Sequence, residues 1–137
     1  MKKVLLSLLF LVMFVGLGFA QRSYIKHNMQ NANGIKGMVV GLDQWQLSAP
    51  TEVYTCVVFF DVNGNQLELN GEPFEIPSDN VFTLPQGNVY AEQFVPYNEI
   101  SPYLQRQVEY GVGLYIYRSS NDDLLISASY METFHLN

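Results

Sequence analysis

Oxygen-bearing side chains recur at alternate positions in one short polar stretch and could bind calcium. They are Asp61, Asn63 and Asn65, with Glu72 eleven positions beyond Asp61. Calcium takes about six to eight oxygen ligands, and alternating Asp and Asn before a distal carboxylate form part of a calcium-loop pattern. Gln66 stands where such a loop needs glycine for its sharp turn, and no helical pattern flanks it. The favoured interpretation is an Asn-Gly hairpin turn, and we expect no metal.

One cysteine and two histidines are the candidates for nucleophilic chemistry: Cys56, His27 and His135. A reactive cysteine needs an exposed setting that lowers its pKa. Cys56 instead lies inside the apolar run VYTCVVFF, which predicts a small buried side chain. The histidines are 108 residues apart and share no spacing typical of metal ligands. We therefore expect no catalytic residue and no cofactor.

Two carboxylates, Glu109 and Glu132, face one another across a C-terminal hairpin in one possible register. Paired carboxylates are the catalytic groups of most glycosidases. A domain this small leaves little room for a substrate cleft beside them. The sequence also lacks the G-x-S-x-G nucleophile elbow and a glycine-rich phosphate loop. A small hydrolase is thus the least favoured interpretation, and we expect that the protein is not an enzyme.

Tyrosine and glycine share one side of the segment 107–118. Its apolar residues recur with a period of two, which predicts a half-buried strand: Val108, Tyr110, Val112, Leu114 and Ile116. The residues that then point away from the core are Gly111, Gly113, Tyr115 and Tyr117, and Leu125 of the next strand is expected beside them. Flat glycine backbone beside tyrosine can form a stacking platform for sugar rings or an interface with another protein. Pairing that only stabilises the sheet, or burial under a loop such as 96–104, is the favoured interpretation of this side of the strand, and a binding face is the alternative.

Short strands separated by turns account for the rest of the chain. Seven strands are expected, at 23–29, 36–47, 53–60, 66–69, 89–95, 107–118 and 124–134. The segment 81–84 is a candidate for an eighth strand, and 74–77 is no more than an edge segment. The strand 53–60 is apolar on both faces, which predicts a central strand. In 36–47 the apolar parity changes between Leu42 and Trp45, so a β-bulge near Asp43 and Gln44 is needed to keep both on one face.

This pattern predicts an all-β fold. About seven or eight strands with turns every 8–12 residues or so are typical of an antiparallel two-sheet β-sandwich, immunoglobulin-like in the broad sense. A small closed barrel is the alternative architecture. No long helix is expected.

Three short motifs occur in order along the chain. Lys36-Gly37-Met38 opens a strand, Phe59-Phe60 precedes Asn63-Gly64, and Phe94-x-Pro96-Tyr97-x-Glu99-Ile100 follows about thirty residues later. In this order they resemble a small β-sandwich module of exported and multidomain bacterial proteins. The resemblance spans most of the chain after the N-terminal segment. It implies a fold with no established activity, often an accessory domain, and no catalytic residue.

The first 20 residues have the pattern of a secretory signal peptide. Lys2 and Lys3 precede an apolar run, and Gly18-Phe19-Ala20 supplies small residues for cleavage before Gln21. The expected product is one domain, residues 21–137, in the periplasm or outside the cell and not inserted in a membrane. Five basic residues (seven minus two) then stand against thirteen acidic ones, a net charge of −8. Such a surface disfavours nucleic acid as a partner.

The favoured function is a non-enzymatic exported module that binds a protein or a glycan at the cell envelope. The alternative is a structural or assembly subunit that pairs through an exposed edge strand.

Overall fold

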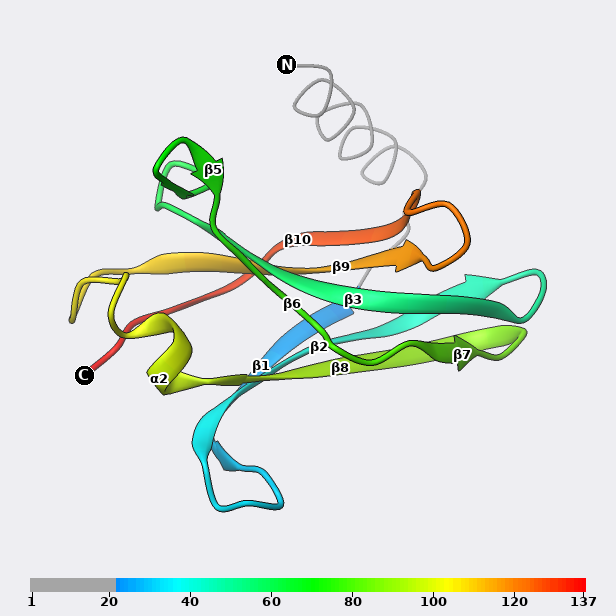
Figure 1. Cartoon of the computed structure of the whole chain (residues 1–137), viewed down its shortest axis with the longest axis horizontal. Coiled ribbons are helices and arrows are strands. Elements are labelled where there is room, and N and C mark those ends of the chain that lie inside the picture. The colour runs from blue at the N-terminus through cyan, green and yellow to red at the C-terminus, as the bar shows by residue number, and fades with distance from the viewer. Residues whose placement is uncertain (1–21) are drawn as a thin grey trace.

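Antiparallel strands make up most of the computed structural model, which describes residues 22–137 without the side chains of 22–23, 43–44 and 127–132 (Figure 1). The predicted all-β class is confirmed. The one helical segment of the described residues is the single turn α2 (Tyr97–Ile100). This part of the chain holds no helix that is long and apolar enough to cross a membrane. The expected signal peptide and its cleavage position lie outside the described residues.

The first of two larger sheets has the strand order β1–β2–β8. Its strands are β1 (Arg22–Gln30), β2 (Lys36–Leu47) and β8 (Gly87–Pro96). Between Leu42 and Trp45 the pairing of β2 with β8 shifts, because two residues of β2 stand opposite one residue of β8. The predicted bulge is therefore confirmed. It keeps Leu42 and Trp45 on the same side, where both contact the core.

The second sheet has the order β10–β9–β3–β6, and β7 extends the β6 edge by pairing with the start of β3. Its strands are β3 (Thr51–Phe60), β6 (Glu75–Pro77), β7 (Phe82–Leu84), β9 (Tyr110–Arg118) and β10 (Leu124–Phe134). A separate small hairpin pairs β4 (Glu68–Leu69) with β5 (Glu72–Pro73). Every residue from Thr55 to Phe60 is buried, so the prediction of a central strand covered on both faces is confirmed.

The described residues form ten strand segments, where about seven or eight were expected. The difference arises in the stretch 68–84, which is cut into four short pieces. Asn70 and Gly71 adopt positive φ in a turn. Pro73 and Pro77 lack the N–H that a longer ladder would need.

The strand expected over 107–118 begins later, at Tyr110. Gln107 has a φ of 62°, and its N–H donates to the carbonyl of Leu136 at 2.7 Å. This contact with the C-terminal segment turns the chain away from the sheet, and Val108 is 36% exposed instead of lying in the core. The other apolar positions of the pattern are buried as predicted: Tyr110, Val112, Leu114 and Ile116.

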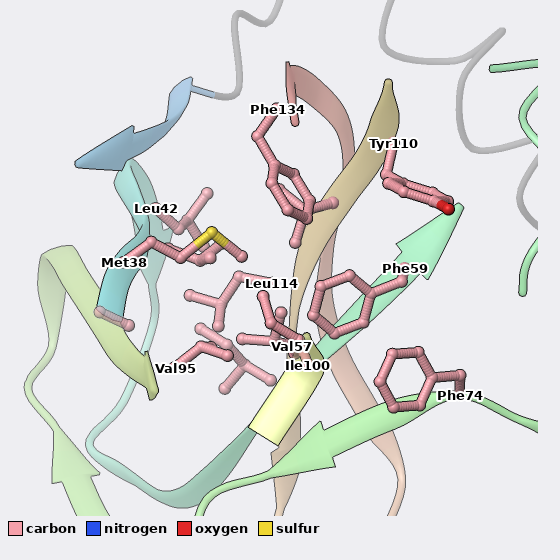
Figure 2. Packing of buried hydrophobic residues seen from close by; sticks show 14 of the residues in the cluster. Met38, Leu42, Val57, Phe59, Phe74, Val95, Ile100, Tyr110, Leu114 and Phe134 are labelled. Atoms are coloured by element: carbon pink, nitrogen blue, oxygen red, sulfur yellow. The ribbon is translucent and has the colours of Figure 1, made fainter. Parts of the chain in front are cut away.

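One apolar cluster draws side chains from both larger sheets (Figure 2). Its members include Met38 and Leu42 of β2, Val95 of β8, Val57 and Phe59 of β3, and Leu114 of β9. The rings of Phe59 and Phe74 stack with their centroids 4.9 Å apart, which ties the stretch before β6 to the core. Fully burying side chains of this size contributes about 1.5–3 kcal/mol each before the entropy of ordering them is subtracted.

A buried polar contact also joins the two sheets. The hydroxyl of Thr55 on β3 donates to Oε1 of Gln93 on β8 at 2.8 Å. Nε2 of the same glutamine donates to the carbonyl of Ile76 on β6, also at 2.8 Å. Both polar side chains are buried, and these bonds satisfy groups whose burial would otherwise be costly. Gln93 thus holds β8 against two strands of the other sheet.

Candidate functional site

The outer face of β3 and β9 carries an apolar cluster that is separate from the main core. Cys56, Val58 and Phe60 are buried there, and Tyr115 and Tyr117 pack against them while remaining partly exposed. These β3 residues alternate with the core residues Val57 and Phe59, so the cluster occupies the opposite side of the same strand. We call this surface the tyrosine face and define it as Tyr54, Cys56, Val58, Phe60, Tyr115 and Tyr117.

Strand register aligns the tyrosines of this face. Tyr117 lies opposite Tyr54 and Tyr115 opposite Cys56 in the β3–β9 pair. The rings of Tyr54 and Tyr117 stack, with centroids 5.4 Å apart and planes 16° from parallel. The hydroxyl of Tyr54 donates to Oδ1 of Asp122 at 2.9 Å, which fixes the orientation of its ring. The result is an ordered aromatic pair at one end of the sheet.

Two glycines of β9 lie in the same face beside the buried part of the cluster. Gly113 is opposite Val58 and Gly111 is opposite Phe60. At Gly111 an added Cβ would meet the Cβ of Phe60 at 3.4 Å, which is an ordinary contact. The structure therefore brings Gly111, Gly113, Tyr115 and Tyr117 together on one face.

Leu125 does not lie in this face, and the prediction that it lies beside the tyrosines is wrong. Leu124 pairs with Tyr117 and Ile126 pairs with Ile116, so Leu125 is the extra residue of a bulge. Its side chain packs against the main core. Leu124 lies beside Tyr117 instead and is 49% exposed. The bulge shifts the parity of β10 by one residue, which sequence alternation alone does not show.

The connecting segment 96–104 does not cover the tyrosine face, although the sequence left this possibility open. Its two buried apolar side chains, Ile100 and Leu104, belong to the main core cluster and not to the tyrosine face. Tyr115 and Tyr117 are each partly exposed. Some aromatic surface is therefore accessible on this face.

Cys56 is buried within the tyrosine face, as the sequence predicts. Burial first, and then electrostatic repulsion and a hydrogen bond from the nearby carboxylate of Glu75, raise the pKa of its thiol to about 12. A thiol with such a pKa is protonated at neutral pH, whereas the nucleophile in cysteine catalysis is the thiolate. Cys56 is thus unsuited to nucleophilic catalysis.

We expect the free energy of unfolding to fall steeply above about pH 9, the ordinary pKa of this thiol. The folded-state pKa is raised, so the stabilisation is complete below the unfolded-state pKa and is lost as the pH rises towards about 12. Each pH unit in that range costs up to about 1.4 kcal/mol. Urea unfolding of the wild type and Cys56→Ala at several alkaline pH values measures the difference. Parallel loss of stability in both proteins would contradict the prediction.

The Asp61 loop uses its carboxylate to close its own turn. Oδ1 of Asp61 accepts hydrogen bonds from the N–H groups of Asn65 and Asn63, each at 2.9 Å. These bonds, that from Asn65 first, hold the pKa of Asp61 below its ordinary value. Glu72 lies in the β4–β5 hairpin, opposite Leu69. The loop has the geometry of an Asn-Gly hairpin turn, and the described side chains include no group of three His, Cys, Asp or Glu able to hold a metal ion.

The other catalytic candidates are not assembled into one site. Glu132 pairs with Val112, so the register that would place it opposite Glu109 does not occur. Glu109 instead lies 3.2 Å from Nδ1 of His135 in an exposed pair. His27 is exposed on β1, in the other sheet from Cys56.

Sequence reasoning missed two residues of this region, Tyr54 and Leu124. Tyr54 has the opposite parity from the core residues Val53 and Val57. The alternation within 53–60 therefore indicated that the Tyr54 side chain points away from the core. Leu124 becomes a neighbour of Tyr117 only through the bulge at the next residue.

Comparison with known proteins identifies no family. No family model matches the sequence, and no curated protein matches it. Among solved structures, it is similar to beta-glucuronidase 2 of Bacteroides uniformis, covalently bound to cyclophellitol-6-carboxylate aziridine, at 10% identity and a TM-score of 0.47. The match covers 84% of this chain and 13% of that chain. At this level of similarity it indicates neither family nor activity.

Proposed function

We propose that this protein is an exported, non-enzymatic module that binds a protein or a glycan at the cell envelope through the tyrosine face. The observation that carries the proposal is an ordered apolar cluster, with a stacked tyrosine pair, on the outside of a sheet whose other side already forms the core. Exposed apolar surface is typical of interaction sites, and the partly exposed rings of Tyr54, Tyr115 and Tyr117 supply it on this face. Tyrosine suits such a site because it combines a large apolar ring with a polar tip.

The proposed architecture is a two-sheet sandwich, immunoglobulin-like in the broad sense. Its support is the apolar cluster shared by β2 and β8 of one sheet with β3, β9 and β10 of the other. In such a fold each outer sheet face is available for binding while the inner faces supply stability. The absence of an activated nucleophile at Cys56 favours binding over covalent catalysis.

Binding to a panel of immobilised bacterial envelope glycans tests the glycan form of the proposal. Tyr117→Ala and Tyr115→Ala are each expected to weaken binding by up to about tenfold, because stacking on an aromatic ring is worth about 0.5–1.5 kcal/mol. Tyr103→Ala is the matched control, since Tyr103 is 56% exposed and belongs neither to the tyrosine face nor to a strand of either sheet. Thermal unfolding of each variant verifies that it is folded.

Site-specific photocrosslinking in intact cells tests the protein form. A photoreactive phenylalanine analogue at Tyr115 is expected to yield a discrete crosslinked product, and the same analogue at the exposed Tyr103 is expected not to yield that product. A wild type that binds no panel glycan and gives no crosslink from Tyr115 would refute the proposed function.

A further inference from the structure

Three strand edges of the two larger sheets are built in ways that obstruct pairing with another strand. The side of β3 that does not pair with β9 is covered by the short segments β6 and β7, which are interrupted by turns and proline. Within β1 the register shifts between Lys26 and Met29, and Asn28 has a φ of 55°. The β10 strand contains two register shifts. Short, proline-bound and bulged edges are the usual protection against unwanted strand pairing.

β8 is different, because it is a long and regular edge strand. It spans ten residues and ends one side of its sheet, with β2 as its sheet partner. The bulge in that pair adds its extra residue to β2, so β8 keeps an unbroken alternation of buried and outward-facing side chains from Asn88 to Val95. Its only proline, Pro96, is the last residue. Near Gln93 the edge approaches β6 through the contact with Ile76, so the open part runs from Gly87 to Glu92.

The one charged residue of β8 is neutralised within its own sheet. Glu92 accepts a hydrogen bond from the Tyr24 hydroxyl at 2.6 Å and lies 3.0 Å from Nζ of Lys26. These contacts, the Tyr24 bond first, lower the pKa of Glu92. A charge that is paired in this way repels an incoming strand less than an unpaired carboxylate would, unless a second carboxylate stands directly opposite it. Tyr90, two residues before it, is 65% exposed.

We infer that the open edge of β8 pairs antiparallel with β8 of a second copy of this chain, about a two-fold axis at Tyr90. This register places Tyr90 opposite Tyr90, Asn88 opposite Glu92, and Val89 opposite Ala91 of the second copy. Residues of equal parity face one another, so outward side chains meet outward ones and the sheet continues across the axis. The resulting interface is isologous, as two-fold symmetry requires.

Electrostatic interactions favour the register with its axis at Tyr90 over the register with its axis at Glu92. Oδ1 of Asn88 accepts a hydrogen bond from Gln46 at 2.6 Å, which orients its NH2 group to donate to the carboxylate of Glu92 in the second copy. A shift that moved the axis to Glu92 would place the two carboxylates opposite one another, which is destabilising. The inferred dimer uses a strand of the other sheet from the tyrosine face and does not rest on the proposed binding function.

Sedimentation equilibrium of the purified full-length protein from about 1 µM to about 1 mM tests the inference. The inferred interface spans only about six residues of each copy, from Gly87 to Glu92, and is therefore small. A reversible dimer with a dissociation constant in the micromolar range is expected. The dissociation constant should decrease as salt is raised, since both copies carry net negative charge and salt screens their repulsion. A wild type that is strictly monomeric at the highest concentration would overturn the inference.

Two matched variants locate the interface. Tyr90→Lys is expected to raise the dissociation constant at least about tenfold by placing two like charges at the axis. Val62→Lys is the control, because Val62 is equally exposed (66%) in the hairpin turn after β3. A dimer that is unaffected by Tyr90→Lys would overturn the assignment to β8, whichever result the glycan panel gives.

Disulfide trapping supplies a second measurement that does not depend on weakening the dimer. Tyr90→Cys should form a disulfide-linked dimer under mild oxidation, because directly opposed Cβ atoms lie about 4.5–5.5 Å apart across an antiparallel pair. Val62→Cys should not do so at the same rate. The native Cys56 is buried and does not compete. Equal rates for the two variants would contradict the register.

Discussion

Replacing Gly37 with alanine is expected to lower the free energy of unfolding by about 3 kcal/mol, the upper part of the range for overpacking. Gly37 lies on β2 where that strand meets the end of β8. A Cβ at this position would overlap the carbonyl oxygen of Val95 and would lie 2.7 Å from the ring of Phe94 and 2.9 Å from Cα of Pro96. Two of these three neighbours are backbone atoms, so relief requires the strands themselves to separate.

Denaturant unfolding of Gly37→Ala measures this effect, and Gly111→Ala is its matched control. Gly111 is also a strand glycine, but its nearest neighbour beyond the adjoining residues would be 3.4 Å from the new Cβ. We expect Gly111→Ala to change stability by less than about 0.5 kcal/mol, as for a substitution without a clash. Equal effects at the two glycines would show that close approach between β2 and β8 is not what requires glycine at position 37.

Gln93→Leu is expected to lower the free energy of unfolding by about 3 kcal/mol, although leucine is apolar and similar in size. The substitution removes the acceptor of the Thr55 hydroxyl and the donor to the Ile76 carbonyl. Each buried polar group left without a partner costs about 1–3 kcal/mol. Chemical unfolding of the wild type and the variant provides the measurement.

A double-mutant cycle with Thr55→Val separates this effect from packing. Thr55→Val alone is expected to cost about 1 kcal/mol, because it leaves one amide oxygen unpaired. In the double variant neither the hydroxyl nor the amide oxygen is left unpaired, so its loss should be smaller than the sum of the single losses by about 2 kcal/mol. Additive losses would mean that the hydrogen bond between Thr55 and Gln93 contributes nothing to the coupling of the two sheets.

Local alternation made most of the fold predictable. The period of two identified the core residues of β9, and a change of parity located the bulge between Leu42 and Trp45. A run that is apolar on both faces identified β3 as central. Each of these conclusions depends on side-chain direction along one strand, which the pleat fixes.

Features that depend on contacts between distant segments could not be predicted from this alternation. The start of β9 at Tyr110 depends on the hydrogen bond between Gln107 and Leu136, and the displacement of Leu125 depends on a bulge set by pairing with β9. The candidate site shows the same division. Its residues on β9 were found from parity, but the stack of Tyr54 on Tyr117 required the β3–β9 register.

The central position of β3 has a consequence for the order in which the chain folds. Both faces of this strand are apolar, yet its long partner β9 follows more than fifty residues later, with Val57 paired to Leu114. Pairing between distant segments is slow, and an unpaired run of β-branched and aromatic residues is prone to aggregation in the meantime. Until synthesis has reached β9, residues 53–60 lack that partner. The interval before β9, in the last fifth of the chain, becomes available is therefore the period in which this run is most exposed to aggregation.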